Sequence, residues 1–181
     1  MKPKLLLHVC CAPCAGYLLK ELQKEFDLTA YFYNPNLDSK EEHQKRLVEA
    51  EKYCKKLKID LVKSDYNHRE WLEIVKGFEN EPEGGKRCLK CFEMRLGEVA
   101  RFAKENDFDC FATTSTVSPY KSAGAIGPIG REVATKFGVK FLDKDFGRRD
   151  GFKKSLEISK EEGFYRQDYC GCEFGRAGDR G

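Results

Sequence analysis

Leu5-Leu6-Leu7-His8-Val9-Cys10-Cys11-Ala12-Pro13-Cys14 is the stretch that decides how this chain folds. Its apolar first half is typical of a buried strand, and the leucines at 18, 19 and 22 follow at the spacing of a helix. Pro13 suits the first turn of that helix, where a missing N–H costs no hydrogen bond. The three thiols therefore stand at a strand-to-helix junction, where open α/β sheets usually bind their ligands.

The start of a helix is a favourable place for reactive cysteines. Its amide groups and the positive end of its dipole lower thiol pKa values and stabilise thiolates, the form that binds metal. A single free cysteine near a strand end is commonly a packing residue. Three within five residues, followed by two further pairs, favour metal binding or redox chemistry instead.

The composition is that of a soluble globular protein. Of the 181 residues, 40% are hydrophobic and 35% charged, which argues against disorder. The net charge is 33 − 30 = +3, so nucleic-acid binding requires a local basic patch. No apolar run approaches the ~20 residues that cross a bilayer, and we expect a cytoplasmic protein without a membrane partner. The length predicts a single domain over residues 1–181, with a loose tail over 173–181.

Nine cysteines are an odd number in a chain too long to need disulfides for stability. In a reducing compartment such clusters indicate metal binding or redox chemistry. Two cysteines are exceptions, because Cys54 falls in a helical pattern and Cys110 beside a predicted strand. We expect both to fill the core. His43 and His68 occur singly in polar surroundings, so we expect them to be exposed and not to bind metal.

Predicted strands and helices alternate along the chain. Further strands are expected at 28–33, 59–62, 108–114 and 139–142, and further helices from Asp38 or Ser39, through 71–78, over 91–103, from about 130 to 137, and around 156–158. This alternation predicts the α/β class with a parallel sheet.

A second pair of thiols lies in Arg87-Cys88-Leu89-Lys90-Cys91, directly after a flexible Gly-Gly loop. Two thiols at this spacing can grip one metal ion or one edge of a cluster, because the intervening turn aims both sulfurs the same way. With the first group they place five sulfurs at the ends of two helices. The combination is a strong signal for a metal centre.

Two later segments suit contact with a nucleic acid. Ser118-Pro119-Tyr120-Lys121 could hold a phosphate, or a ribose whose base stacks on Tyr120, although an ordinary Ser-Pro turn is the alternative. The stretch from Arg148 to Arg166 is basic and could follow a nucleic-acid backbone, although such runs are often only solvated helix faces.

The last pair of thiols is Cys170-Gly171-Cys172. A disulfide here would close a very small ring, so it would be strained and readily reduced. That property suits a redox relay. A further pair of metal ligands is the alternative, because thiolates serve either role.

Four motifs together resemble those of the cobalamin-independent epoxyqueuosine reductases. They are His8-Val9-Cys10-Cys11-Ala12-Pro13-Cys14, Arg87-Cys88-Leu89-Lys90-Cys91, Ser118-Pro119-Tyr120-Lys121 and Tyr165-Arg166-Gln167-Asp168-Tyr169-Cys170-Gly171-Cys172. The resemblance covers nearly the whole chain. It implies a three-layer, Rossmann-like sheet of the adenine-nucleotide alpha hydrolase-like kind, with cysteine-rich loops and a helical C-terminal segment. It also implies the last step of queuosine biosynthesis, in which epoxyqueuosine in tRNA loses its epoxide oxygen with electrons from an as yet unidentified donor.

The resemblance further implies roles for individual residues. It implies a [4Fe–4S] cluster on Cys10, Cys11, Cys88 and Cys91, and a redox-active disulfide between Cys170 and Cys172. Four ligands complete a cluster, so we hypothesise that Cys14 places a second metal ion, iron or zinc, or activates a proton donor. The expected substrate contacts are Ser118, Tyr120, Lys121, Arg148, Arg149 and Arg166.

Two other function classes fit part of the pattern. An ATP-dependent tRNA-modifying enzyme of the same fold needs a phosphate loop after the first strand, where this chain has cysteines and a proline. A non-catalytic zinc module would use Cys10, Cys11, Cys88 and Cys91 as a closed Cys₄ site.

Overall fold

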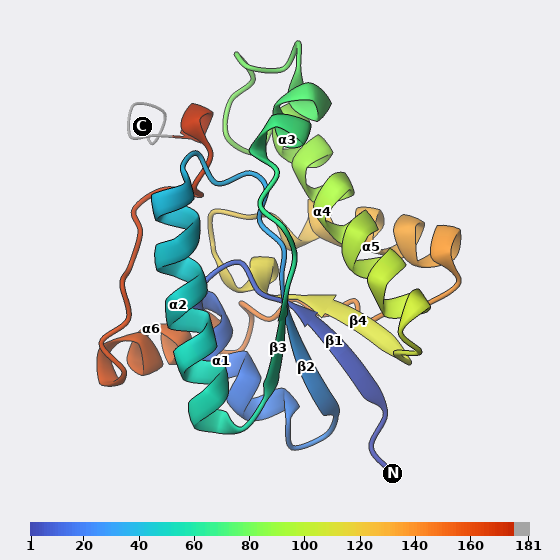
Figure 1. Ribbon diagram of the computed structural model, residues 1–181, viewed down its shortest axis with the longest axis vertical. Coiled ribbons are helices and arrows are strands. Elements are labelled where there is room, and N and C mark those ends of the chain that lie inside the picture. Colours follow the sequence, from blue (N-terminus) through green and yellow to red (C-terminus); the bar gives the residue numbers. More distant parts are fainter. Residues whose placement is uncertain (176–181) are drawn as a thin grey trace.

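The computed structural model of the chain describes residues 1–175 and has helices on both sides of a parallel five-stranded sheet (Figure 1). The strands are β1 (Lys4–His8), β2 (Asp27–Phe32), β3 (Asp60–Lys63), β4 (Cys110–Thr113) and β5 (Lys140–Phe141). The helices are α1 (Ala12–Leu22), α2 (Lys40–Leu57), α3 (His68–Val75), α4 (Lys86–Glu105), α5 (Ala123–Phe137) and α6 (Gly151–Glu161), with 3₁₀ turns η1 (Thr114–Val117) and η2 (Glu173–Gly175). The predicted α/β class is confirmed.

The hydrophobic core consists of two layers, one on each face of the sheet. Helices α1, α2 and α6 pack on one face, where they enclose Leu5 and Leu7 of β1. Helices α4 and α5 pack on the other face around Leu6. All three leucines are fully buried. A central parallel strand is covered on both sides, which is why β1 reads as a continuous apolar run without alternation.

The strand order β3-β2-β1-β4-β5 places a topological switch point beside β1. The chain builds the sheet outward from β1 through β2 to β3, and then crosses to the opposite side of β1 to form β4. At such a point the loops diverge and leave a crevice above the carboxyl ends of the strands. The first cysteine group follows β1 at this point, and Thr114 follows the neighbouring β4.

Two helices start at this end of the sheet, close to the residues that the sequence indicated. Cys11 is the N-cap of α1, and Pro13 lies in its first turn. Ser39, one of the two residues from which this helix was expected to start, is the N-cap of α2, and its hydroxyl accepts a hydrogen bond from the Glu42 N–H at 3.1 Å.

Helix α5 begins earlier than the sequence suggested, at Ala123 instead of near residue 130. Its first half contains two glycines and Pro128, which are poor helix formers, so the pattern there resembles a loop. The Ser122 hydroxyl caps the helix by accepting from the Ala125 N–H at 3.2 Å. Gly130 is needed because a Cβ there would lie 2.2 Å from the ring of Phe141 on β5. The glycine thus serves close packing of helix on sheet.

Gly130→Ala is therefore expected to destabilise the fold by about 1–3 kcal/mol, the usual cost of overpacking. Gly97→Ala on α4 is the matched control, because a Cβ at that position meets nothing within 4 Å. Its better helix propensity is expected to add up to about 1 kcal/mol. Urea unfolding of both variants measures the difference. Equal stabilities would contradict the close contact with Phe141.

The two core cysteines are confirmed, since Cys54 and Cys110 are buried. The prediction that His43 is exposed was wrong. Its ring is buried and packs edge-on against Phe32, with 5.2 Å between the ring centroids. His68 is half-buried, and its Nδ1 lies 2.8 Å from the carbonyl oxygen of Pro35. Both histidines therefore pack in the structure instead of extending into water.

Part of the expected tail is seen. Residues Glu173–Gly175 form η2, and Phe174 stacks on Trp71 with 6.1 Å between ring centroids. Residues 176–181 of that expected tail lie outside the described residues. Within residues 1–175, none of the helices combines the length and the hydropathy required to span a membrane.

Candidate metal and redox site

Three thiols come together at the junction of β1 and α1. The sulfur atoms of Cys10, Cys11 and Cys14 all lie within 4.8 Å of one another, and Cys10 Sγ is 3.8 Å from Cys11 Sγ. Sulfurs that surround one tetrahedral ion at about 2.3 Å lie about 3.8 Å apart. Cys14 joins the group because it lies three residues after the N-cap, on the face of the helix that carries Cys11. The three cysteines form a group that can hold a metal.

The surroundings of Cys10 favour its thiolate. Hydrogen bonds from the Cys11 and Cys14 thiols lower the pKa of Cys10 well below its ordinary value, and the charges of Lys121 and Arg95 act in the same direction. The Thr114 hydroxyl oxygen accepts from the Cys10 N–H at 3.2 Å and lies 3.3 Å from Cys10 Sγ, where the hydroxyl can donate to a thiolate. One anionic sulfur among two neutral thiols is a suitable starting point for metal binding.

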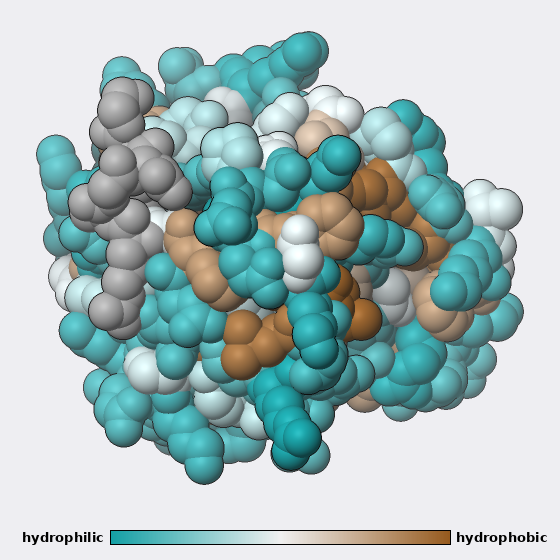
Figure 2. Space-filling view, turned by 90° about the horizontal axis from the view of Figure 1, so that it is seen from above, coloured by the Kyte–Doolittle hydropathy of each residue, from teal (hydrophilic) through white to brown (hydrophobic). Residues whose placement is uncertain are grey.

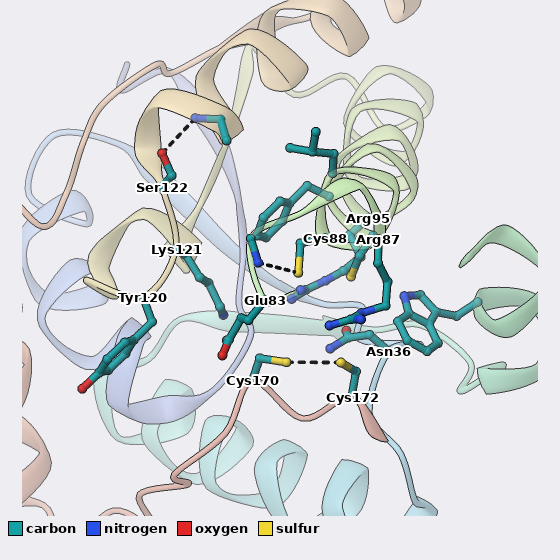
Figure 3. Close-up of a pocket in the computed structure, with 16 residues that line it drawn as sticks. Asn36, Glu83, Arg87, Cys88, Arg95, Tyr120, Lys121, Ser122, Cys170 and Cys172 are labelled. Carbon is teal, nitrogen blue, oxygen red and sulfur yellow. Dashed lines mark hydrogen bonds between the residues drawn. The ribbon is translucent and has the colours of Figure 1, made fainter. Parts of the chain in front are cut away.

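A pocket next to this group is lined by four further thiols (Figure 3). They are Cys88 and Cys91 from the start of α4, and Cys170 and Cys172 from the C-terminal segment. The backbone N–H of Gly84 donates a hydrogen bond to Cys88 Sγ at 3.2 Å. Lys121 and Arg95 connect the two sets of thiols, because both line this pocket and both act electrostatically on Cys10.

Cys170 and Cys172 are in direct contact, with 3.4 Å between their sulfur atoms. The Cys172 thiol lowers the pKa of Cys170 from 9.0 to about 6 through this hydrogen bond, and the same interaction raises the pKa of Cys172. The left-handed backbone at Gly171, with φ +110, turns the chain between them. The pair is therefore a dithiol with one thiolate at neutral pH.

This pKa predicts how Cys170 reacts with iodoacetamide. Because only the thiolate reacts, alkylation of Cys170 is expected to become half-maximal near pH 6 and to be nearly complete at about pH 8. Cys172→Ala is expected to move the midpoint upward, since alanine offers no hydrogen bond to the Cys170 sulfur. Peptide mass spectrometry across a pH series measures both midpoints. Equal midpoints in the two proteins would contradict the proposed thiol–thiolate pair.

A family model described as Epoxyqueuosine reductase QueH matches residues 5–178, which include every thiol of this site. The chain belongs to that family. Curated family members agree over most of the chain. The epoxyqueuosine reductase QueH of Streptococcus pyogenes is 37% identical over 180 residues, which are 96% of this chain and 71% of that protein. The one from Thermotoga maritima is 35% identical over 173 residues, 94% of this chain and 88% of that protein.

Solved structures show the fold of this epoxyqueuosine reductase family member. The U34-tRNA thiolase NcsA from Methanococcus maripaludis, described with its [4Fe–4S] cluster, superposes with a TM-score of 0.61 at 15% identity, covering 96% of this chain and 62% of that one. A predicted subunit of tRNA methyltransferase from Methanocaldococcus jannaschii gives 0.57 at 11%, covering 91% and 93%. The fold is adenine-nucleotide alpha hydrolase-like, as expected.

The substrate contacts expected for this epoxyqueuosine reductase occupy three places. Tyr120 and Lys121 line the thiol pocket, Tyr120 at 65% exposure and Lys121 with its ammonium group directed inward (Figure 3). Burial alone would lower the pKa of Lys121, yet the thiols of Cys10 and Cys14 raise it overall. Ser118 lines an adjoining groove with Arg148. Arg149 and Arg166 are exposed, before and after α6.

The pocket rim is partly apolar. Figure 2 looks down on the end of the molecule where α2 and α4 begin, and hydrophobic residues gather near its middle between hydrophilic ones. Leu89, which is 39% exposed, lines the pocket together with Tyr120. Large exposed apolar side chains at a pocket mouth are suited to contact with a flat organic ring.

Sequence reasoning missed the buried cations of the site, Arg46, Arg87 and Arg95. A signal for Arg95 was present, because it stands within the apolar stripe of α4, between Phe92 and Leu96 on the helix. An arginine at a core position of a helix indicates a buried partner.

Proposed function

We propose that this chain reduces epoxyqueuosine in tRNA to queuosine, with a [4Fe–4S] cluster held by Cys10, Cys11, Cys88 and Cys91. The carrying observation is the arrangement of seven thiols in two adjoining sets at the switch point of the sheet, in a chain of the epoxyqueuosine reductase family. The lowered pKa of the Cys10 thiol and the cations near it favour thiolate ligation at this cysteine, whereas burial raises the pKa of the Cys88 thiol. When bound, such a cluster supplies electrons one at a time.

The reaction determines what the residues of the pocket must provide. Conversion of an epoxide to an alkene breaks two C–O bonds, consumes two electrons and two protons, and releases water. At neutral pH the pair is a Cys170 thiolate and a Cys172 thiol, and its oxidation to a disulfide yields two electrons and one proton. The second proton would come from another donor, such as the Cys14 thiol or water. The 3.4 Å contact between Cys170 and Cys172 supports their role as the electron source. An external reductant would then restore the dithiol.

Cys14 is proposed to act beside the cluster. Its sulfur lies in the group of Cys10 and Cys11, so it can share a second metal ion, iron or zinc, with one of them. A cation there would act as a Lewis acid on the departing oxygen. Alternatively, the raised pKa of the Cys14 thiol, which its hydrogen bonds to Cys10 and Cys11 produce, keeps it protonated as a proton donor.

The substrate base must leave the anticodon loop to reach these thiols. Bases in single-stranded loops can be splayed out and stacked on aromatic side chains, which suits Tyr120 at the pocket mouth. The ammonium group of Lys121 would contact the part of the substrate that enters the pocket. Arg148, Arg149 and Arg166 would contact the RNA backbone from outside.

The test is anaerobic purification followed by iron and sulfide analysis and turnover of tRNA that carries epoxyqueuosine. Iron together with sulfide, with queuosine as product, is the expected result. Zinc without sulfide would favour the zinc module, and ATP consumption would favour the ATP-dependent class.

Binding of tRNA is expected to depend on salt. The triple variant Arg148→Gln, Arg149→Gln, Arg166→Gln is expected to bind tRNA more weakly. The slope of log affinity against log salt concentration is expected to fall by about one for each phosphate that these side chains neutralise. Lys24→Gln, in an exposed ion pair with Glu21 after α1, is the control. Filter binding at several salt concentrations measures the slopes. A slope unchanged in the triple variant would place the RNA elsewhere.

A further inference from the structure

Three arginines beside the thiols are almost completely buried. The exposed fractions are 3% for Arg46, 1% for Arg87 and 3% for Arg95. Each has one side-chain nitrogen that finds no hydrogen-bond acceptor within residues 1–175, namely Nη2 of Arg46, Nε of Arg87 and Nε of Arg95. A buried charge and a buried unsatisfied donor are both costly in free energy. The three arginines therefore indicate a binding partner that is not among residues 1–175.

Carboxylates do not supply that partner for two of the three. Arg46 pairs with Glu42 at 2.7 Å. Arg87 donates instead to the backbone carbonyls of Glu79 and Glu81, and Arg95 donates to the Asn34 side-chain oxygen at 2.7 Å. In the part of the chain that the structure describes, neither Arg87 nor Arg95 forms an ion pair with a carboxylate. Among the described residues that line the pocket, one carboxylate, Glu83, stands against three cations, Arg87, Arg95 and Lys121, so positive charge is in excess there.

His8 does not balance this charge. Its Nε2 lies 3.4 Å from Arg95 Nη2, but an imidazole carries no negative charge. Its Nε2 lies 3.0 Å from the carbonyl oxygen of Tyr33 and must carry the proton that this oxygen accepts. The other ring nitrogen then accepts from the Thr113 hydroxyl at 2.9 Å. The imidazole thus offers Arg95 no free acceptor.

The sulfur atoms are the groups that these arginines face. In Figure 3 the side chains of Arg87 and Arg95 reach into the space between Cys88 and the Cys170–Cys172 pair. Arg87 acts electrostatically on Cys88 and Cys172, and Arg95 acts on Cys10.

Arg46 completes the arrangement from the opposite side. It comes from α2, donates to the Cys170 carbonyl oxygen at 3.2 Å and interacts electrostatically with Cys11. The arginines therefore surround both sets of thiols from two different helices.

We propose that Arg46, Arg87 and Arg95 form a cationic shell that balances the negative charge of a sulfur-ligated metal centre and donates N–H hydrogen bonds to its sulfur atoms. The inference rests on the proposed function, because it requires the thiols to hold a metal centre. A thiolate-ligated cluster is anionic and becomes more so when it gains an electron. Hydrogen bonds and nearby cations stabilise the reduced form, so the arginines raise the reduction potential.

Arginine variants of the anaerobically purified full chain test the shell. Arg95→Met is expected to lower the ratio of reduced to oxidised cluster about tenfold at a fixed applied potential, which is about 59 mV for one electron. Arg95→Lys keeps the charge and is expected to shift less. The control is Arg101→Met, a partly exposed arginine of the same helix that pairs with Glu98 and Glu105. Spectroelectrochemical titration measures the potentials, and chelator challenge measures how long iron is retained.

Several results would decide the question. Unchanged potential and unchanged iron retention in Arg95→Met and Arg87→Met would overturn the proposal, as would variants that lose only tRNA affinity, because the arginines would then bind a substrate phosphate. Faster iron loss from a variant whose circular dichroism matches that of the control supports the shell, particularly if lysine restores retention.

If the parent protein holds neither iron nor sulfide, the proposed cluster is wrong. The shell is then tested by the affinity of the apoprotein for Zn²⁺, which falls in Arg95→Met if the shell acts on the thiolates and is unchanged if it does not.

Discussion

Cys88→Ser and Cys91→Ser are each expected to lose iron, sulfide and epoxyqueuosine reduction together. A serine hydroxyl is not deprotonated at neutral pH and is a poor ligand for iron in a cluster, so removal of one of the paired ligands opens the centre. The change is small in volume, and Cys88 lies in the first turn of α4, so the fold is expected to remain. Iron and sulfide analysis, the visible spectrum and single-turnover product analysis of the same preparations measure the loss.

Cys110→Ser is the matched control. Cys110 is buried in β4 and belongs to the core, outside both sets of thiols. This variant is expected to keep iron, sulfide and activity, even if it is slightly less stable. Full iron content and turnover in Cys91→Ser would remove the Cys-x-x-Cys pair from the cluster. The ligands would then have to be sought among the three thiols at the start of α1 and the pair at the C-terminus.

The sequence was sufficient for the parts of the fold that depend on local pattern. A continuous apolar run, followed by a helical period and a first-turn proline, predicted β1 and α1. Burial on both faces of a strand and the geometry of a helix each produce a recognisable pattern in the local sequence. The alternation of such segments predicted a parallel α/β sheet. The order of the strands cannot be seen in the local sequence, since it depends on pairing between strands that are far apart along the chain.

Errors arose where tertiary packing overrides local preference. The first half of α5 looked like a loop because its glycines and Pro128 are poor helix formers, whereas the structure uses Gly130 to bring the helix against Phe141. His43 looked exposed because its neighbours in sequence are polar. Its neighbours in space are Phe32 and Tyr66, and burial lowers the pKa of its ring.

The residue types of the site were predictable from the sequence, but which of these residues lie close together in space was not. Spacing along one helix explains why Cys14 joins Cys10 and Cys11. The approach of Cys170 and Cys172 to the pocket depends instead on contacts between distant segments, such as the hydrogen bond from the Asp38 N–H to the Gly171 carbonyl oxygen at 2.8 Å. Buried arginines were missed for the same reason, since an arginine acquires its role from what surrounds it in space.

Cys170→Ser and Cys172→Ser are expected to separate the dithiol from the metal centre. If the pair donates two electrons as it becomes a disulfide, neither variant can complete the transfer in this way, because the remaining thiol has lost the sulfur that lies 3.4 Å away. Turnover is expected to fall by at least about 100-fold in each, while iron and sulfide content remain those of the parent protein. Cys170 and Cys172, whose sulfur atoms lie 3.4 Å apart, would then act as one unit. The turnover of the double variant is therefore expected to be no lower than that of either single variant.

Counting thiols makes the assignment quantitative. In a single turnover without added reductant, the parent protein is expected to lose two alkylatable thiols, located at Cys170 and Cys172 by peptide mass spectrometry, for each queuosine formed. Cys110→Ser should show the same loss of two, since its thiol takes no part. Loss of iron in both serine variants would instead make the pair metal ligands, which is the alternative for Cys-Gly-Cys. Retained iron with unchanged turnover would mean that electrons reach the substrate without these two sulfurs, and the lowered pKa of Cys170 would then be a consequence of packing alone.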